Sequence, residues 1–421
     1  MSEPAAPLTV AEAGRRIVAA LAPLPPERVS LPDALGRVLA EALVSPVTLP
    51  AWRNAGMDGY AVFAADLAGA TADAPVRLPV AETVAAGAFP SRPLRRGEAM
   101  RVMTGAPVPD GADSVVRVED SDGGDQTVAL ADTRDAGRNV RPLGEDMRVG
   151  DTVLAAGTPI TAGVVGVLAA CGASVVSVFR RPRVAIVGSG DELVELDRFA
   201  EALAGRKVVS TNGYALHAAI RAAGGTPVDL GIASDSPDSL RERFARAAGC
   251  DLLVTSAGNS AGAFDYTQDA VRALGGRVEF RRVRMRPGAP LSFGSVAGVP
   301  WIGLPGNPVS ALVTGELFVR PAIRRLGGHA APFRAPVEVT LAEDVHTGAP
   351  ALTHYLRAVV SADAEGRLSA RLTGAQGSGL VSSMARANAL LVVPEGRAGA
   401  AAGERLRALL LDDGPAAGAA A

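Results

Sequence analysis

Short apolar runs alternate with segments of helical period between residues 181 and 326. The apolar runs, which each stop at turn residues, are 184–187, 228–232, 252–255 and 301–304. The helical-period segments are 214–223, 237–248, 266–274 and 309–326. Strands buried on both faces that alternate with helices are typical of doubly wound sheets. The pattern therefore predicts a mostly parallel α/β sheet, whose ligand lies beyond the carboxyl ends of its strands.

The segments on either side of this sheet follow other patterns. Residues 8–21 have helical period, with Thr9 as N-cap and Glu12 three residues later. Residues 35–42 predict a second, short helix. Short β-like runs broken by prolines fill 51–140 and predict a small all-β domain. A last group of expected strands belongs to a C-terminal β domain and comprises 337–341, 356–361, 367–372 and 389–393.

These patterns predict a multidomain α/β protein in which a β domain is inserted into a helical one. Residues 146–179 are expected to form a helix and an extended strand that pack with the N-terminal helix. The expected divisions are a helical domain at 1–50 and 141–179, an inserted β domain at 51–140, a central α/β domain at 180–328 and a C-terminal β domain at 329–415.

Composition narrows the class of protein. The 421 residues carry a net charge of −2, so nothing indicates a nucleic-acid partner. Cys171 and Cys250 lie far apart and favour a reducing compartment, so we expect a cytoplasmic protein. The four histidines form no metal motif. The uncharged stretch 160–179 is long enough to span a bilayer, but Gly172 divides it, and we expect no membrane span.

Two strand ends have the residue types that bind phosphate. In LPGNPVS at 304–310, Pro308 suits the first helical position and Asn307 the N-cap. Such a start leaves free N–H groups that bind anions, although an ordinary capped helix has the same sequence. GSGDE at 188–192 begins like a dinucleotide fingerprint but lacks its third glycine, and Asp191 there suits a helix cap.

Three carboxylates each follow a strand-like run: Glu192, Asp235 and Asp265. Each has an ordinary explanation near a helix start, and Asp265 in particular fits a capping box. Their shared position at strand ends nevertheless favours convergence on one edge of the sheet. Carboxylates beside phosphate-binding helix starts are what a Mg²⁺-assisted phosphate reaction needs. The arginines at 281, 282, 284 and 286 are either a solvated strand face or a lining for an oxyanion.

Taken together, the motifs resemble those of the molybdenum insertase family, which comprises the MoeA-like proteins and the E domain of gephyrin. The resemblance covers nearly the whole chain in order. The matching motifs are NAGMDGYAV at 54–62, RVMTGAPVP at 101–109, GED at 144–146, GDEL at 190–193, STN at 210–212, DYT at 265–267, LPGNPVS at 304–310 and QGS at 376–378.

The resemblance implies a fold, a reaction and a partner. The fold would be a subunit of four domains, among them an elongated helical domain and a barrel-like C-terminal domain. Two such subunits would form a homodimer. The reaction would insert molybdate into adenylylated molybdopterin with Mg²⁺-dependent release of AMP. Asp58 and Thr104 would reach the active site from the β domain of the second subunit.

The resemblance also implies roles for individual residues. The catalytic positions would be Asp58, Thr104, Glu192, Asp235, Asp265 and Arg286, and three of these, Glu192, Asp235 and Asp265, would hold the metal. Ser310, Arg357 and Ser383 match positions of the molybdate pocket. The remaining ligand-binding positions would be Gly190, Asp191, Asn212, Ser256, Gly258, Ser260, Pro305, Gly306 and Asn307.

The chain departs from the family pattern at several positions. Ala257 stands where a glycine usually lets the backbone approach the ligand. Gln268 and Ala289 stand where family members have lysine, and Arg286 replaces a lysine but keeps its charge. A divergent paralogue that binds ligands or acts as a scaffold without turnover is therefore an alternative. An adenylyltransferase acting one step earlier would resemble only the central domain, and a nicotinamide dehydrogenase would need the missing glycine.

Overall fold

The computed structural model describes residues 6–257, 263–411 and 416–417. Two compact units make up the chain. The first comprises Met1–Ala40, Gly157–Val165 and Val175–Ala421, and the second Glu41–Ala156 and Gly166–Ser174.

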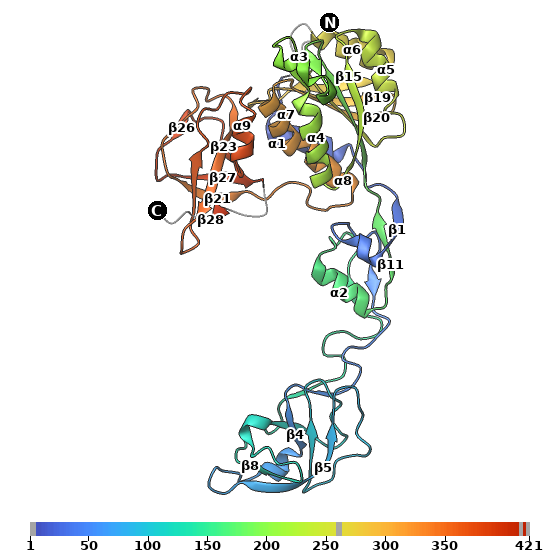
Figure 1. Cartoon of the computed structure of the whole chain (residues 1–421), viewed down its shortest axis with the longest axis vertical. Helices are drawn as coiled ribbons and strands as arrows, with labels where there is room; N and C mark the ends of the chain where they lie inside the picture. The colour runs from blue at the N-terminus through green and yellow to red at the C-terminus, as the bar shows by residue number, and fades with distance from the viewer. Residues whose placement is uncertain (1–5, 258–262, 412–415, 418–421) are drawn as a thin grey trace. The chain divides into compact units, whose positions relative to one another are not determined.

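A six-stranded sheet forms the centre of the first unit (Figure 1). In spatial order its strands are β15 (Thr226–Ala233), β12 (Arg183–Ser189), β16 (Leu252–Ser256), β20 (Val299–Leu304), β19 (Pro290–Val296) and β17 (Arg277–Arg282). The first four pair in parallel and are the four strands predicted from the apolar runs. The last two pair antiparallel, so the sheet is mostly parallel, as expected.

Helices cover both faces of this sheet because alternate residues of its strands are buried on opposite sides. Val184 and Ile186 pack on one face with α1 (Val10–Ala19), α4 (Thr211–Ala222), α7 (Pro308–Thr314) and α8 (Arg320–Leu326). Ala185 and Val187 pack on the other face with α5 (Pro237–Ala245) and α6 (Ala263–Ala273). A turn of π-helix, η5 (Gly315–Val319), joins α7 to α8.

The N-terminal segment confirms some expectations and corrects others. The capping box of Thr9 and Glu12 is present at the start of α1. However, α1 packs on α8 within the central core, whereas β11 (Val175–Phe179) pairs with β1 (Pro26–Ser30). The second short helix predicted at 35–42 is absent, and a 3-10 turn, η1 (Leu31–Ala34), precedes that segment.

The short helix α2 (Ala162–Ala170) lies within the uncharged stretch 160–179. It is separated from β11 by Gly172, whose φ of +73° belongs to the left-handed region that favours glycine. In the part of the chain that the structure describes, no helix is long and apolar enough to cross a membrane.

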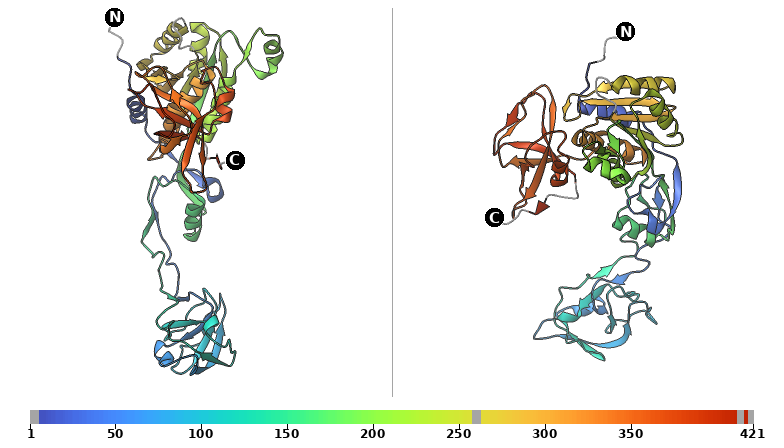
Figure 2. Two further views of the ribbon diagram at one scale, coloured as in Figure 1. Left: turned by 90° about the vertical axis from the view of Figure 1, so that its left-hand side faces the viewer. Right: turned by 45° about the horizontal axis from the view of Figure 1, so that its top comes forward.

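The C-terminal region closes into a barrel (Figure 2). Its strands follow the order β23 (Thr353–Ala362), β24 (Leu368–Leu372), β21 (Val337–Leu341), β27 (Arg405–Leu410) and β25 (Ala389–Val393). The ring is complete because β25 also pairs with β23. Four of the five strands were predicted from the sequence, and β27 was not.

The second unit contains the inserted β domain. Its five-stranded sheet has the order β7 (Ser114–Arg117), β4 (Gly59–Val62), β6 (Ala99–Val102), β5 (Val76–Val84) and β8 (Thr127–Leu130). A separate pair joins β3 (Asn54–Ala55) to β9 (Val140–Arg141). These strands confirm that the region predicted as a small all-β domain is built from β-sheet.

A half-buried histidine beyond α8 makes stability depend on pH. Burial, together with the neighbouring charges of Arg324 and Arg320, lowers the pKa of His329 from 6.5 to about 4. The unfolded chain therefore binds a proton between pH 6.5 and 4 that the folded chain excludes, so stability is lost as pH falls through this window. We expect a loss on the order of 2 kcal/mol, after allowance for solvent screening.

Melting temperatures at pH 7 and pH 4.5 are measured for the wild type and for His329→Asn, whose side chain cannot take up the proton. Carboxylates titrate equally in both proteins, so the difference between them isolates His329. An equal acid shift in the two proteins would contradict the assignment.

Candidate functional site

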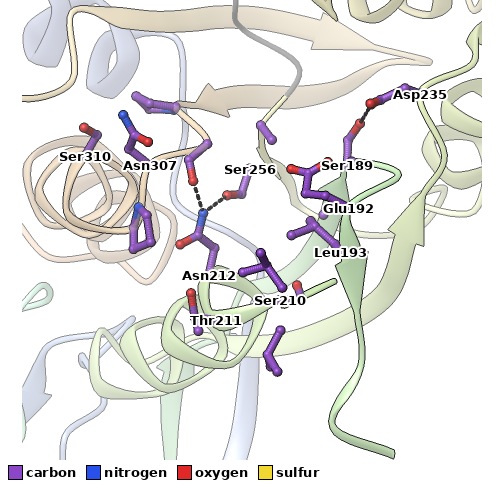
Figure 3. A pocket seen from close by; sticks show the side chains of 18 of the residues that line it. Ser189, Glu192, Leu193, Ser210, Thr211, Asn212, Asp235, Ser256, Asn307 and Ser310 are labelled. Atoms are coloured by element: carbon purple, nitrogen blue, oxygen red, sulfur yellow. Dashed lines mark hydrogen bonds between the residues drawn. The ribbon is translucent and has the colours of Figure 1, made fainter. Parts of the chain in front are cut away.

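A cavity of about 560 Å³ lies at the carboxyl ends of the parallel strands (Figure 3). The chain leaves β12 toward β15 on one side, and β16 lies on the other side, so the cavity sits where the strand order reverses. This is the position at which open α/β sheets bind ligands. Nine of the predicted site residues line it: Gly190, Glu192, Asn212, Asp235, Ser256, Pro305, Gly306, Asn307 and Ser310.

Two carboxylates, Glu192 and Asp235, stand at one end of the cavity. Ser189 Oγ donates a hydrogen bond of 3.1 Å to Asp235 Oδ1, and the Asp235 amide donates to Asp191 Oδ1 at 3.2 Å. The loops that follow β12 and β15 therefore brace each other. Asp191 acts in this brace and does not line the cavity.

Because Gly190 has no side chain, the Glu192 carboxylate can lie directly against it at the cavity. A Cβ on Gly190 would stand 2.6 Å from a Glu192 carboxylate oxygen, and the glycine has a φ of +147°. Any other residue would therefore push the carboxylate aside.

In the structure, these carboxylates do not hold the helix N-cap positions that were an alternative explanation for them. Asp191 and Glu192 lie in a turn before the short strand β13 (Leu193–Val194), so the helix expected there is absent. Ser236 caps α5 by accepting from the Ser239 amide, so Asp235 is not the cap. Asp265 is the third residue of α6 and lies inside that helix, although its side chain falls outside the described part of the chain.

The start of α7 has the predicted residues, since Pro308 is the first residue of the helix, but its hydrogen bonds differ from the prediction. Asn307 holds the N-cap position, but its side chain accepts no hydrogen bond from the helix. Instead Asn307 Nδ2 donates to Ser378 Oγ at 3.1 Å, and the Val309 amide donates to the Ser378 carbonyl at 3.1 Å. One of the expected free amides is therefore already bound by the loop that contains QGS at 376–378.

Asn212 faces the cavity with an oriented amide (Figure 3). Its Nδ2 donates to Ser256 Oγ and to the Gly306 carbonyl, both at 2.7 Å. A carbonyl can only accept, so the nitrogen must face it. The buried Oδ1 then has no hydrogen-bond partner in the described part of the chain. A buried acceptor without a partner costs about 1–3 kcal/mol, which a donor on a ligand would recover.

Ala257 adopts a backbone conformation that suits glycine. Its φ is +80°. Its Cβ lies 3.2 Å from the position that a Cβ on Gly306 would take, beyond the end of the neighbouring strand β20. A left-handed alanine costs about 1–2 kcal/mol. Because that strain disappears with glycine, we expect Ala257→Gly to stabilise the protein by about 1 kcal/mol.

Thermal unfolding tests this, with Ala297→Gly (φ +49°) as a control that should change stability in the same direction. A lower melting temperature for Ala257→Gly would contradict the account.

Arg357 is a buried cation on β23 with neutral partners. It donates through Nε to Ser383 Oγ and through Nη2 to the Gly377 carbonyl, both at 3.0 Å. Its Nη1 is buried and has no partner in the described part of the chain. Burial lowers the pKa of the guanidinium, yet an arginine stays charged at neutral pH. Arg357 and Ser383 do not line the cavity, but Arg357 bonds to the loop whose Ser378 accepts a hydrogen bond from Asn307, a residue that does line it.

Other predicted residues lie elsewhere or outside the described part. Arg286 is exposed on β18 (Met285–Arg286), which pairs with β23, and it does not line the cavity. Gly258 and Ser260 fall outside the described residues, as does the side chain of Gln268. Three polar residues that line the cavity were not singled out from the sequence: Ser189, Ser210 and Thr211. Ser210 and Thr211 lie within the STN motif that the resemblance had marked, and Ser189 directly precedes the GDEL motif.

In the second unit, Asp58 and Thr104 form a bonded pair. Asp58 Oδ1 accepts from the Thr104 hydroxyl at 2.6 Å and from the Thr104 amide at 2.7 Å. These hydrogen bonds lower the pKa of Asp58. Next to Asp58, Gly59 lets β4 lie close to β7, since a Cβ there would come within 1.9 Å of the Val116 carbonyl.

The donors around the cavity are suited to a hard cation and to phosphate. Carboxylate and hydroxyl oxygens are the ligands that Mg²⁺ prefers. Among the described residues no group of three or more His, Cys, Asp or Glu is placed to hold a metal ion by itself. The described carboxylates would therefore share a cation with further oxygen donors, such as those of a phosphorylated ligand.

Three models of protein families match this chain, one after another along the sequence. The model of the MoeA N-terminal region, domains I and II, matches residues 8–172. A model described as a probable molybdopterin binding domain matches 185–325, and that of the MoeA C-terminal region, domain IV, matches 338–411.

Relatives match over almost their full length. Molybdopterin molybdenumtransferase 2 of Mycobacterium tuberculosis is 39% identical over 390 residues, which are 91% of this chain and 94% of the relative. Molybdopterin molybdenumtransferase of Bacillus subtilis is 34% identical, covering 98% and 96%. The crystal structure of a molybdopterin biosynthesis moeA protein from Pyrococcus horikoshii OT3 matches 96% of this chain and 100% of its own, with a TM-score of 0.82 and 27% identity. The chain therefore belongs to the MoeA family of molybdopterin molybdenumtransferases.

Proposed function

We propose that the chain inserts molybdenum from molybdate into molybdopterin that arrives as its adenylylated form, with release of AMP. Membership of the family makes it a transferase of molybdenum cofactor biosynthesis. The observation that carries the finer proposal is the cavity at the switch point of the sheet. It combines carboxylates at one end with hydroxyls and glycine turns, which suits a phosphoanhydride next to a divalent cation.

Mg²⁺ fits the donor set of this cavity. Glu192 and Asp235 would hold it, and Asp265 on the neighbouring helix α6 remains a predicted third ligand. When bound, Mg²⁺ supplies positive charge that offsets the charge developing on the anhydride. The protein itself keeps the carboxylates in place through Gly190, which leaves room for Glu192, and through Ser189, which orients Asp235.

The chain's own residues would position the substrate for hydrolysis. Water would attack the adenylyl phosphorus, and the anhydride P–O bond would break to leave AMP and molybdopterin, which keeps its own phosphate. The buried Oδ1 of Asn212 can accept a hydrogen bond from the substrate, because both hydrogens of Nδ2 are already used. The brace between Asp191 and Asp235 keeps the two strand-end loops together during this step.

Molybdate, an oxyanion substrate, would be held near Arg357, Ser383 and Ser310. Guanidinium and hydroxyl donors suit oxyanions, and Arg357 has a buried N–H group without a partner among the described residues. The hydrogen bonds of Arg357 to the 374–378 loop, and of that loop to Asn307, link this cation to the mouth of the cavity.

A direct test follows AMP release from adenylylated molybdopterin. We expect release that requires both Mg²⁺ and molybdate, and that stops when either is withheld. Binding of the substrate without AMP release would instead support the alternative of a scaffold protein on the same fold.

The proposed site also needs a second subunit, because the resemblance assigns Asp58 to the partner. We expect Asp58→Asn and Glu192→Gln to be inactive alone and to recover activity when co-expressed. Random pairing makes half of the dimers mixed, and each mixed dimer has one of two sites intact, so roughly a quarter of wild-type activity should return. Co-expression of Asp235→Asn with Glu192→Gln, which damage the same half of the site, serves as the control and should recover nothing. Absence of recovery in the first pair would contradict a shared site.

A further inference from the structure

A second cavity of about 270 Å³ adjoins the first. Gly188 and Ser210 line both cavities, so the two cavities meet at these residues. The second cavity lies between α4 and the edge of the sheet formed by β12 and β15.

The charged side chains that line this second cavity are acidic. Glu195 and Asp229 supply carboxylates, and among the described residues no lysine or arginine lines the cavity. Asp229 Oδ1 accepts from the Gly231 amide at 2.8 Å. Neither carboxylate has an ion-pair partner among the described residues. A phosphate would therefore be repelled, whereas a neutral group that donates hydrogen bonds would be attracted.

Two flat side chains accompany these acceptors. Tyr214 and His217 are three residues apart on α4 and so share one face of the helix. Tyr214 Oη donates to Glu195 Oε2 at 3.0 Å and accepts from the Leu196 amide at 3.3 Å, which fixes the phenol. Aromatic rings at this spacing offer surfaces on which a flat heterocycle can stack.

We propose that this second cavity binds the amino-substituted heterocycle at one end of the substrate, while the phosphates remain in the first cavity. Adenine with its ribose and the pterin both have this chemistry, since each is flat, neutral and rich in N–H or O–H donors. The inference rests on the proposed function, because that function supplies a ligand with a heterocycle on each side of its phosphates.

Isothermal titration tests the proposal with two probes, AMP and molybdopterin, the latter under anaerobic conditions. The double variant Glu195→Gln and Asp229→Asn removes both charges with little change of shape. We expect it to raise the Kd of one probe at least tenfold and to leave the other within twofold. The weakened probe identifies which heterocycle the cavity holds. Asp197→Asn, an exposed acid that does not line the cavity, is the matched control.

A double variant that keeps its melting temperature and binds both probes like the wild type would overturn the proposal, as would a wild type that binds neither. His217→Ala adds a readout, since loss of a stacking surface should weaken the same probe. Failure of the proposed function looks different. In that case the wild type binds the probe through this cavity but releases no AMP from the adenylylated substrate.

Discussion

Glu192→Gln is expected to lower the rate of AMP release by about 100-fold or more, while the fold remains unchanged. The side chain of Glu192 is exposed at the cavity and lies over Gly190, so it contributes little to packing. A neutral amide keeps the shape but removes the negative charge that would hold Mg²⁺ against the anhydride. Stability should change by no more than about 0.5 kcal/mol, as for other surface substitutions.

The measurement is single-turnover AMP release at several Mg²⁺ concentrations. A partial rescue at high Mg²⁺ is expected if Glu192 acts through the cation. Glu242→Gln, an exposed glutamate on α5, is the matched control and should be fully active. Normal turnover by Glu192→Gln would assign the metal to other residues and would contradict the role given to Glu192.

Arg357→Met is expected to abolish molybdate-dependent turnover and to raise the Kd for molybdate at least 100-fold. A buried charge-assisted donor contributes about 1.5–3 kcal/mol per hydrogen bond, so losing more than one is enough for this effect. Methionine fills much of the volume of the arginine stem and leaves no unpaired charge at this buried position. Loss of an ionic group that has only neutral partners should not unfold the barrel.

Molybdate binding measured by calorimetry separates the proposed role from a structural one. Arg371→Met, an exposed arginine on the neighbouring strand β24, is the control. Unchanged molybdate affinity in Arg357→Met would reduce Arg357 to a support for the 374–378 loop.

The sequence predicted the parts of the fold that rest on local pattern. The four parallel strands were visible because both faces of each are buried, which gives continuous apolar runs. The antiparallel strands β17 and β19 were missed as sheet members, because one has exposed arginines and the other follows a proline-rich turn. The segment after β12 was misjudged as a helix start, since GSGDE has the composition of a cap but turns into β13 instead.

The candidate site was predictable where residues follow strands directly. Glu192 and Asp235 line one cavity because the parallel strands β12 and β15 end at the same edge, whereas Asn212, on α4, was marked only by the resemblance. What the sequence could not provide was the hydrogen-bond network. Ser236 was as plausible a cap as Asp235 until the helix start was known. Likewise, the occupation of the Val309 amide by Ser378 depends on contact between segments about 70 residues apart, which no local pattern contains.

In the proposed function, one protein couples AMP release to molybdenum insertion. Both products can be quantified in one reaction that contains the protein, adenylylated molybdopterin, molybdate and Mg²⁺. We expect one AMP to be released for each molybdenum atom bound to the dithiolene, with both products reduced together in Glu192→Gln. AMP released without molybdenum insertion, or bound substrate with neither product, would contradict it.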